Sequence, residues 1–302
     1  MVTMWVTVVA LLAAVFTCAM GDPPLLEGIF PHPSTKDVAM RNAPIHKSFL
    51  SSTLGSNMVL QRAPDQAVVW GFTKAGATVT TTLGQNLTLK STADAQGVWR
   101  QFLPPMEASH TPYTLTFSAS TGETARMENV LFGDVYLCGG QSNMQFAMPA
   151  IENASTEAAR ADAYPSIRLF SVGQGTSSPT PLDDLQTIQE GWTVANHTSI
   201  AAGGAFGYFS AVCWIFGREL FDALGGKVPI GLISNNWGGT PVESWTTPEA
   251  LQVCNRTTVD SKLFNAMINP YTVGPMSLVG FTWYQGEANV DEAGQEDRGA
   301  TK

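Results

Sequence analysis

Positive charge is scarce in this sequence. The 302 residues contain 16 Lys and Arg against 25 Asp and Glu, which gives a formal net charge of −9 at pH 7. No cluster of five or more basic residues occurs, which argues against a nucleic-acid partner. Charged residues make up only 14% of the chain and hydrophobic residues 44%, so the chain can bury a sizeable core in one or two domains.

Cysteine is also rare, and the spacing of Cys18, Cys138, Cys213 and Cys254 matches no zinc site. We therefore predict no zinc site that is built on these cysteines. Cys18 lies in the apolar N-terminal stretch, and the other three are an odd number. Either these three are buried thiols, or two form a disulfide and one stays free.

Long apolar runs are absent after the first twenty residues. The opening stretch "MVTMWVTVVALLAAVFTCAM" is followed by "GDPP" and predicts a secretory signal peptide over residues 1–21, with a membrane anchor as the alternative. No later segment is long and apolar enough to span a bilayer, so no membrane partner is predicted. The Asn-x-Ser/Thr sequons agree with secretion and predict glycosylation sites. They are Asn86, Asn153, Asn196 and Asn255.

The rest of the chain divides by pattern into three parts. Residues 22–47 are Pro-rich and predict an extended lead-in. Residues 48–128 consist of short alternating apolar runs between turn residues, which predicts a small β-sandwich domain. Over residues 129–302, apolar runs alternate with segments of helical period, which predicts an α/β domain with a parallel sheet and flanking helices.

Three predicted strands of the second domain end in unusual polar or glycine-rich segments: "CGGQSNM", "SNNWGGTPVESW" and "WYQGEANV". Ligands of an open parallel sheet bind at the carboxyl ends of its strands. Ser142 could act there as a nucleophile, with its own backbone N–H and that of Gly238 as oxyanion donors. Gln285 or Asn289 could add a side-chain amide donor.

Each of these segments also has an ordinary structural explanation. Ser142 could be the N-cap of a helix in a plain βα turn. Glu287 could be a solvated carboxylate, and "NNWGG" could be a loop. The segment "GQSNM" does not fit the G-x-S-x-G elbow, because Met144 replaces the last glycine. Only the joint occurrence of the three strand ends favours an esterase site.

Four ordered motifs carry a family resemblance: "GDVYLCGGQSNMQF", "SAVCWIFGREL", "PIGLISNNWGGTPVESW" and "WYQGEANV". They resemble the sialate O-acetylesterases, which are secreted or lysosomal serine esterases of the SGNH-hydrolase type. The resemblance extends over about residues 48–290. It implies removal of O-acetyl groups from sialic acids without a metal or other cofactor, with Ser142 as the nucleophile and Gly238 and Gln285 in the oxyanion hole. Glu287 and Asn289 would orient these groups.

The sequence departs from this family in its general base, which is a histidine in an Asp-x-x-His motif downstream of the "QGE" segment. The four histidines are His32, His46, His110 and His197, and none has that motif. His110 has an acid three residues earlier but precedes the serine, and His197 is expected on a surface loop. We therefore expect a chain that is incomplete at its C-terminus.

Two alternatives to a sialate esterase remain open. One is a catalytically inactive carbohydrate-binding or regulatory form, and the other is an acetylesterase that acts on another polysaccharide. Three tryptophans beside the predicted site could line a sugar pocket or belong to the core. They are Trp237, Trp245 and Trp283.

Overall fold

The computed structural model describes residues 47–84, 87–202, 204, 206–207, 209–254 and 261–289. The predicted signal peptide, nearly all of the lead-in, His32, His46 and the sequons at Asn86 and Asn255 lie outside the described residues.

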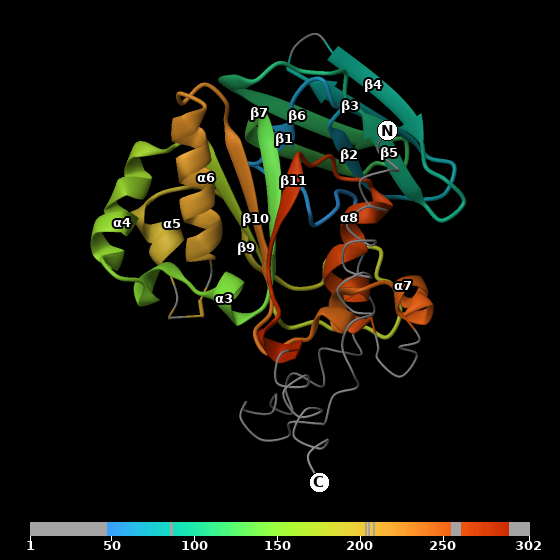
Figure 1. Ribbon diagram of the computed structural model, residues 1–302. Helices are drawn as coiled ribbons and strands as arrows, with labels where there is room; N and C mark the ends of the chain where they lie inside the picture. Colours follow the sequence, from blue (N-terminus) through green and yellow to red (C-terminus); the bar gives the residue numbers. More distant parts are fainter. Residues whose placement is uncertain are drawn as a thin grey trace.

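The described residues form a mixed α/β structure (Figure 1). Nine strands make one large sheet with the order β4-β3-β6-β7-β10-β8-β9, and β1 and β11 also pair with β7. Strands β2 and β5 form a separate two-stranded sheet. The strands are β1 Val59–Gln61, β2 Val68–Phe72, β3 Thr78–Leu83, β4 Leu87–Thr92, β5 Val98–Phe102, β6 Ser109–Ala119, β7 Thr124–Gly140, β8 Ile167–Val172, β9 Ile188–Val194, β10 Ile230–Asn236 and β11 Gly280–Tyr284.

Strand β7 joins the two halves of the large sheet. Its first part pairs antiparallel with β6, and its last part pairs parallel with β10 and β11. Residues 130–135 are all buried, as expected for a strand that is covered on both faces. The predicted boundary between residues 128 and 129 falls inside β7, so the two predicted domains share this strand.

The predicted parallel sheet is confirmed for the strand order β11-β7-β10-β8. Strand β9 pairs antiparallel with β8 at the edge. In the β-rich part, β2 and β5 pack over the larger sheet, and their side chains share one core with those of β3, β6 and β7. The predicted sandwich is thus a local packing of two sheets, of which the larger continues into the α/β part.

Helices cover both faces of the parallel strands (Figure 1). On one face α4, α5 and α6 pack over β7, β8 and β10. On the other face the π-helical turn η4 and α8 contribute to the core. The helices are α3 Ser142–Gln145, η1 Met148–Ala150, α4 Ala154–Arg160, η2 Ala161–Ala163, α5 His197–Ala201, α6 Ala211–Ala223, η3 Val242–Trp245, α7 Pro248–Val253, η4 Phe264–Ile268 and α8 Pro270–Val273.

A disulfide ties strand β7 to this helical layer. Cys138 of β7 bonds to Cys213 of α6, and both residues are fully buried. Helix α6 begins at the side chain of Ser210, which accepts a hydrogen bond from the Cys213 N–H. Among the described residues no cysteine is free, so both predicted alternatives, three buried thiols or one disulfide with a leftover thiol, are wrong. The same part of the chain contains no helix with the length and hydropathy of a membrane span.

Candidate active site

The carboxyl ends of β11, β7 and β10 lie side by side, as the sequence predicted. Gly140 at the end of β7 is in register with both Asn236 of β10 and Tyr284 of β11. Backbone hydrogen bonds continue past the strand ends, from the Gln141 N–H to the Tyr284 carbonyl at 3.1 Å and from the Trp237 N–H to the Gly140 carbonyl at 3.0 Å. The three segments therefore meet at the turn that carries Ser142.

The two glycines before this turn are required by their surroundings. Gly140 has a φ of +145°, and a Cβ added to it would lie 2.0 Å from the Tyr284 carbonyl oxygen. A Cβ on Gly139 would lie 2.7 Å from the indole ring of Trp283. Only glycine allows this backbone conformation and this close approach of β11. The turn can thus place Ser142 directly against the end of the neighbouring strand.

Ser142 is the first residue of α3 and is half-buried. The N-cap position belongs to Gln141, and no side chain caps the helix, so the alternative in which Ser142 is the N-cap is wrong. Within the described part of the chain, the Ser142 hydroxyl makes no hydrogen bond. A serine without a structural partner at a strand end is available as a nucleophile.

Gly238 lies against this serine. A Cβ built on Gly238 would be 3.3 Å from Ser142 Cβ and 2.9 Å from Gln145 Oε1. The Gly238 N–H donates to Gln145 Oε1 at 2.7 Å, and Gln145 Nε2 donates to Gln174 Oε1 at 2.9 Å. The N–H that was predicted as an oxyanion donor therefore lies beside Ser142, and it is bonded to a side-chain carbonyl oxygen.

Gln285 is also brought to the turn, through Gln141. The Nε2 atom of Gln285 donates to Asn289 Oδ1 at 2.7 Å, to Gln141 Oε1 at 3.1 Å and to the Thr240 carbonyl at 3.3 Å. Asn289 is buried and in turn donates from Nδ2 to Glu243 Oε2 at 2.8 Å.

Glu287 is exposed, and its Oε1 accepts a short hydrogen bond from Asn143 Nδ2. Gln141 and Asn143, the two neighbours of Ser142, are thus both tied to the segment after β11. These contacts bring the residues predicted for the esterase site into one cluster.

Sequence reasoning missed three members of this cluster: Gln141, Gln145 and Glu243. Gln141 flanks the serine, and Gln145 follows it by about one helical turn, which places both beside it. Glu243 is the single acid in the segment "GGTPVESW". Its position between a glycine turn and a tryptophan was the available signal for a buried carboxylate.

Neither described histidine reaches this cluster. His110 contacts Ser166, which directly precedes β8, through its Nδ1 at 2.7 Å. Ser166 marks the amino end of the parallel strands, whereas Ser142 lies at their carboxyl end. Along β7, six residues separate the level of Ser166 from the strand end that precedes Ser142. This corresponds to about 20 Å at roughly 3.3 Å per residue. A general base must lie within hydrogen-bond reach, so the minor candidate His110 is excluded as the base.

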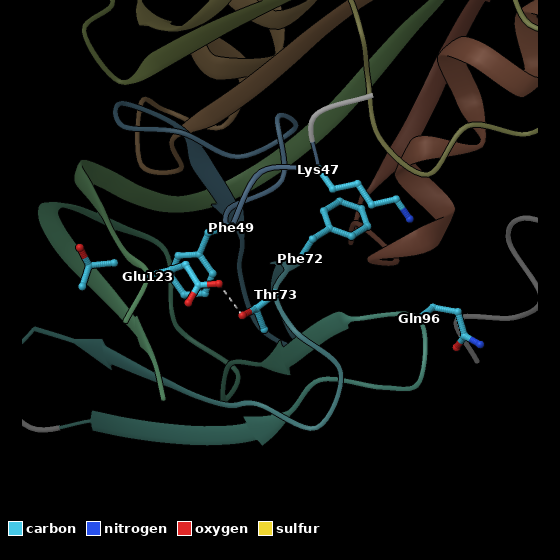
Figure 2. Close-up of a pocket in the computed structure, with 7 residues that line it drawn as sticks. Lys47, Phe49, Phe72, Thr73, Gln96 and Glu123 are labelled. Atoms are coloured by element: carbon cyan, nitrogen blue, oxygen red, sulfur yellow. Dashed lines mark hydrogen bonds between the residues drawn. The ribbon is translucent and has the colours of Figure 1, made fainter. Parts of the chain in front are cut away.

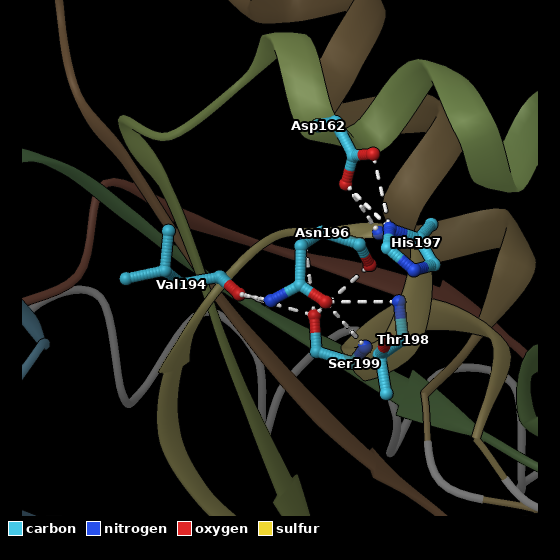
Figure 3. A network of polar contacts seen from close by, with 6 residues as sticks. All are labelled: Asp162, Val194, Asn196, His197, Thr198 and Ser199. Carbon is cyan, nitrogen blue, oxygen red and sulfur yellow. Dashed lines mark hydrogen bonds and ion pairs between the residues drawn. The ribbon is translucent and has the colours of Figure 1, made fainter.

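His197 lies at the same distant end. It is exposed at the start of α5, and its Nδ1 contacts the carboxylate of Asp162 at 3.0 Å (Figure 3). The adjacent Asn196 caps α5 through Oδ1 and donates from Nδ2 to the Val194 carbonyl at 3.0 Å. The Asn196 side chain thus has a structural role, whereas Asn153 is exposed in a left-handed turn.

The tryptophans differ in role. Trp245 is buried, whereas Trp283 is 44% exposed and packs edge-on against Trp245 with ring centroids 5.7 Å apart. Trp237 is half-buried and packs against the main core.

A separate hollow lies in the β-rich part of the molecule and includes Phe49 and Phe72 in its lining (Figure 2). Three of its polar side chains, those of Lys47, Thr73 and Glu123, have partners inside or beside the hollow. Glu123 accepts a hydrogen bond from Thr73 at 2.8 Å, and Lys47 pairs with Asp183 at 2.7 Å. The hollow offers no group that resembles the Ser142 cluster. Among the described residues, no group of His, Cys, Asp and Glu could hold a metal ion.

Comparison with known proteins identifies the family of this protein. The family model "Carbohydrate esterase, sialic acid-specific acetylesterase" matches residues 132–298. This protein belongs to that family. It is 39% identical over 262 residues to the sialate O-acetylesterases of Pongo abelii and Homo sapiens, and 37% identical over 288 residues to that of Mus musculus. Each match covers 80% of this chain.

A solved structure of a carbohydrate acetylesterase from Xanthomonas citri is also similar, with a TM-score of 0.69 and 31% sequence identity. That match covers 80% of this chain and 52% of the bacterial one. The chain spans about half the length of the curated relatives it matches, 49% of the human protein and 52% of the mouse protein.

Proposed function

We propose that this protein is a serine esterase that hydrolyses O-acetyl esters of sialic acids, on a sheet of the SGNH-hydrolase type. The observation that carries the proposal is the Ser142 hydroxyl at the carboxyl ends of β7, β10 and β11, which has no hydrogen-bond partner among the residues that the structure describes. Family membership supports the substrate class, because the family's description names sialic acid-specific acetylesterases.

In the proposed reaction, Ser142 Oγ attacks the carbonyl carbon of the acetyl ester. The carbonyl oxygen becomes an oxyanion, the bond to the sugar oxygen breaks, and the sugar hydroxyl leaves with a proton. Water then hydrolyses the acetyl-serine and releases acetate. The Ser142 N–H, Gly238 N–H and Gln285 Nε2 would stabilise the oxyanion, and one such donor is worth about 10²- to 10³-fold in rate. Gln145 would have to release the Gly238 N–H first.

The general base is proposed to come from outside the described residues. A serine hydroxyl is a weak nucleophile without a base within reach, and both described histidines lie at the opposite end of the parallel strands. The family resemblance assigns this role to a histidine in an Asp-x-x-His motif.

Two other functions each have an observation in their favour. Similarity to the Xanthomonas citri carbohydrate acetylesterase favours an acetylated polysaccharide as the alternative substrate. The distance of both described histidines from Ser142 favours a non-catalytic form that binds acetylated sugars.

We also propose that the protein is secreted or lysosomal. The apolar N-terminal stretch supports this location. The disulfide between Cys138 and Cys213 supports it as well, because disulfides persist mainly in oxidising compartments.

Acetate release from O-acetylated sialic acid tests the proposal, with the Ser142→Ala variant as the matched control. In a form of the protein that includes the general base, we expect acetate release and a loss of at least about 10³-fold in the variant. Equal rates would exclude Ser142 as the nucleophile. Release from acetylated polysaccharide alone would favour the second substrate class. Binding of O-acetylated sialic acid without any release would favour the non-catalytic form.

A further inference from the structure

A buried carboxylate lies behind the Ser142 turn. Glu243 in the short helix η3 is only 1% exposed, and its Oε2 accepts a hydrogen bond from Asn289 Nδ2 at 2.8 Å. An amide nitrogen can only donate, and the carboxylate oxygen accepts. This contact therefore fixes which end of the Asn289 amide faces Glu243, and it turns Asn289 Oδ1 the other way.

The orientation of Asn289 in turn fixes that of Gln285. Asn289 Oδ1 accepts from Gln285 Nε2 at 2.7 Å and from the Val242 N–H at 3.1 Å. Because Asn289 offers only an acceptor on this side, Gln285 must present its nitrogen. The second hydrogen of that nitrogen lies between Gln141 Oε1 at 3.1 Å and the Thr240 carbonyl at 3.3 Å.

Gln141 completes this amide relay, which consists of Glu243, Asn289, Gln285 and Gln141. It is 3% exposed and directly precedes Ser142. Besides Gln285, its Oε1 accepts from the N–H groups of Gly286 at 3.3 Å and Ala288 at 3.1 Å. Rotation of this amide would turn its NH₂ group toward these N–H groups and leave the buried donors without partners, which is unfavourable.

We propose that Glu243 and Gln141 are positioning residues that keep the nitrogen of Gln285, rather than its oxygen, turned toward the Ser142 turn. This inference rests on the proposed function, in which Gln285 stabilises the oxyanion. A reversed amide would place an oxygen lone pair against the developing negative charge and repel it. An oxyanion on the Ser142 adduct can compete for the hydrogen that Gln141 and Thr240 share, because both of these contacts are longer than the one to Asn289.

Substitutions of Glu243 and Asn289 test the amide relay by exchanging its hydrogen-bond donors and acceptors. Glu243→Gln keeps the size of the side chain but can present either a nitrogen or an oxygen to Asn289, so the constraint on Gln285 is lost. We expect kcat for acetate release to fall about 10- to 100-fold with KM within about twofold, since a misoriented group acts mainly on the transition state. Glu249→Gln, at an exposed position in α7, is the matched control and should leave both constants unchanged.

The double variant Glu243→Gln, Asn289→Asp should restore kcat. The new carboxylate at position 289 accepts from the glutamine on one side and from Gln285 on the other, so the orientation of Gln285 is recovered. A role of Glu243 in packing or net charge alone does not predict this rescue. The inference is overturned if Glu243→Gln keeps its kcat within twofold, or if the double variant is no faster than the single variant.

Side-chain amide signals of ¹⁵N-glutamine-labelled protein separate this inference from the proposed function. The Gln285 NH₂ signals should exchange slowly with solvent in the unmodified protein, quickly in Glu243→Gln and slowly again in the double variant. If this pattern appears without any acetate release, the proposed function fails and the relay stands. If acetate is released but the Gln285 signals are the same in all three proteins, the relay fails and the proposed function stands.

Discussion

Glu190 of β9 should make the stability of this protein depend on pH. Its Oε2 is buried without a hydrogen-bond partner among the described residues, and it lies opposite Ser171 of β8. Burial raises the pKa of this carboxyl from 4.5 to about 7. This rise in pKa corresponds to about 3 kcal/mol at roughly 1.36 kcal/mol per pKa unit.

The direction of this pH dependence follows from whether the folded or the unfolded state binds the Glu190 proton more tightly. The folded state holds the proton of Glu190 more tightly than the unfolded state. At low pH the carboxyl therefore does not lower the free energy of unfolding. The cost grows as pH rises above 4.5, the unfolded value, and is fully present above about 7. Glu190→Gln removes the ionisation and should raise the free energy of unfolding by about 2–3 kcal/mol at pH 8, and by much less at pH 5.

Urea unfolding at both pH values measures this difference, and equal m-values would show that the same transition is compared. Glu152→Gln, at an exposed position before α4, is the matched control and should change stability little at either pH. An equal gain from Glu190→Gln at pH 5 and pH 8 would refute the reasoning, since it would then reflect packing rather than charge. A loss at pH 8 would mean that the carboxylate is stabilised by a partner.

Two further predictions concern the framework of the site. Gly140→Ala should lower the free energy of unfolding by at least about 2 kcal/mol and weaken acetate release, because the added Cβ would meet the Tyr284 carbonyl oxygen at 2.0 Å. Chemical unfolding and amide exchange in β11 measure this effect. A neutral result would contradict the close approach of β7 and β11. Reduction of the disulfide between Cys138 and Cys213, which are separated by 75 residues, should lower stability by about 4 kcal/mol from loop entropy. Unfolding with and without a reductant checks this value, and an unchanged midpoint after verified reduction would contradict it.

Local pattern was sufficient for most elements and for the composition of the site. The strand over residues 130–140 and the helix over residues 208–226 were visible as an apolar run and as an amphipathic period that ends in glycines. The order in which strands pair was not visible in this way. A single strand, β7, serves both the antiparallel and the parallel part, because pairing partners are chosen by contacts between segments far apart in the sequence.

The sequence alone determined that Ser142 follows two glycines at a strand end, and that two other strands end in amide-rich segments. These features depend on neighbouring residues, whose preferences act over one turn or one strand. Only the tertiary structure decided the orientation of the amides. Glu243 lies 46 residues from Asn289 along the chain, and the direction of each hydrogen bond in the amide relay depends on the buried partner that folding brings to it.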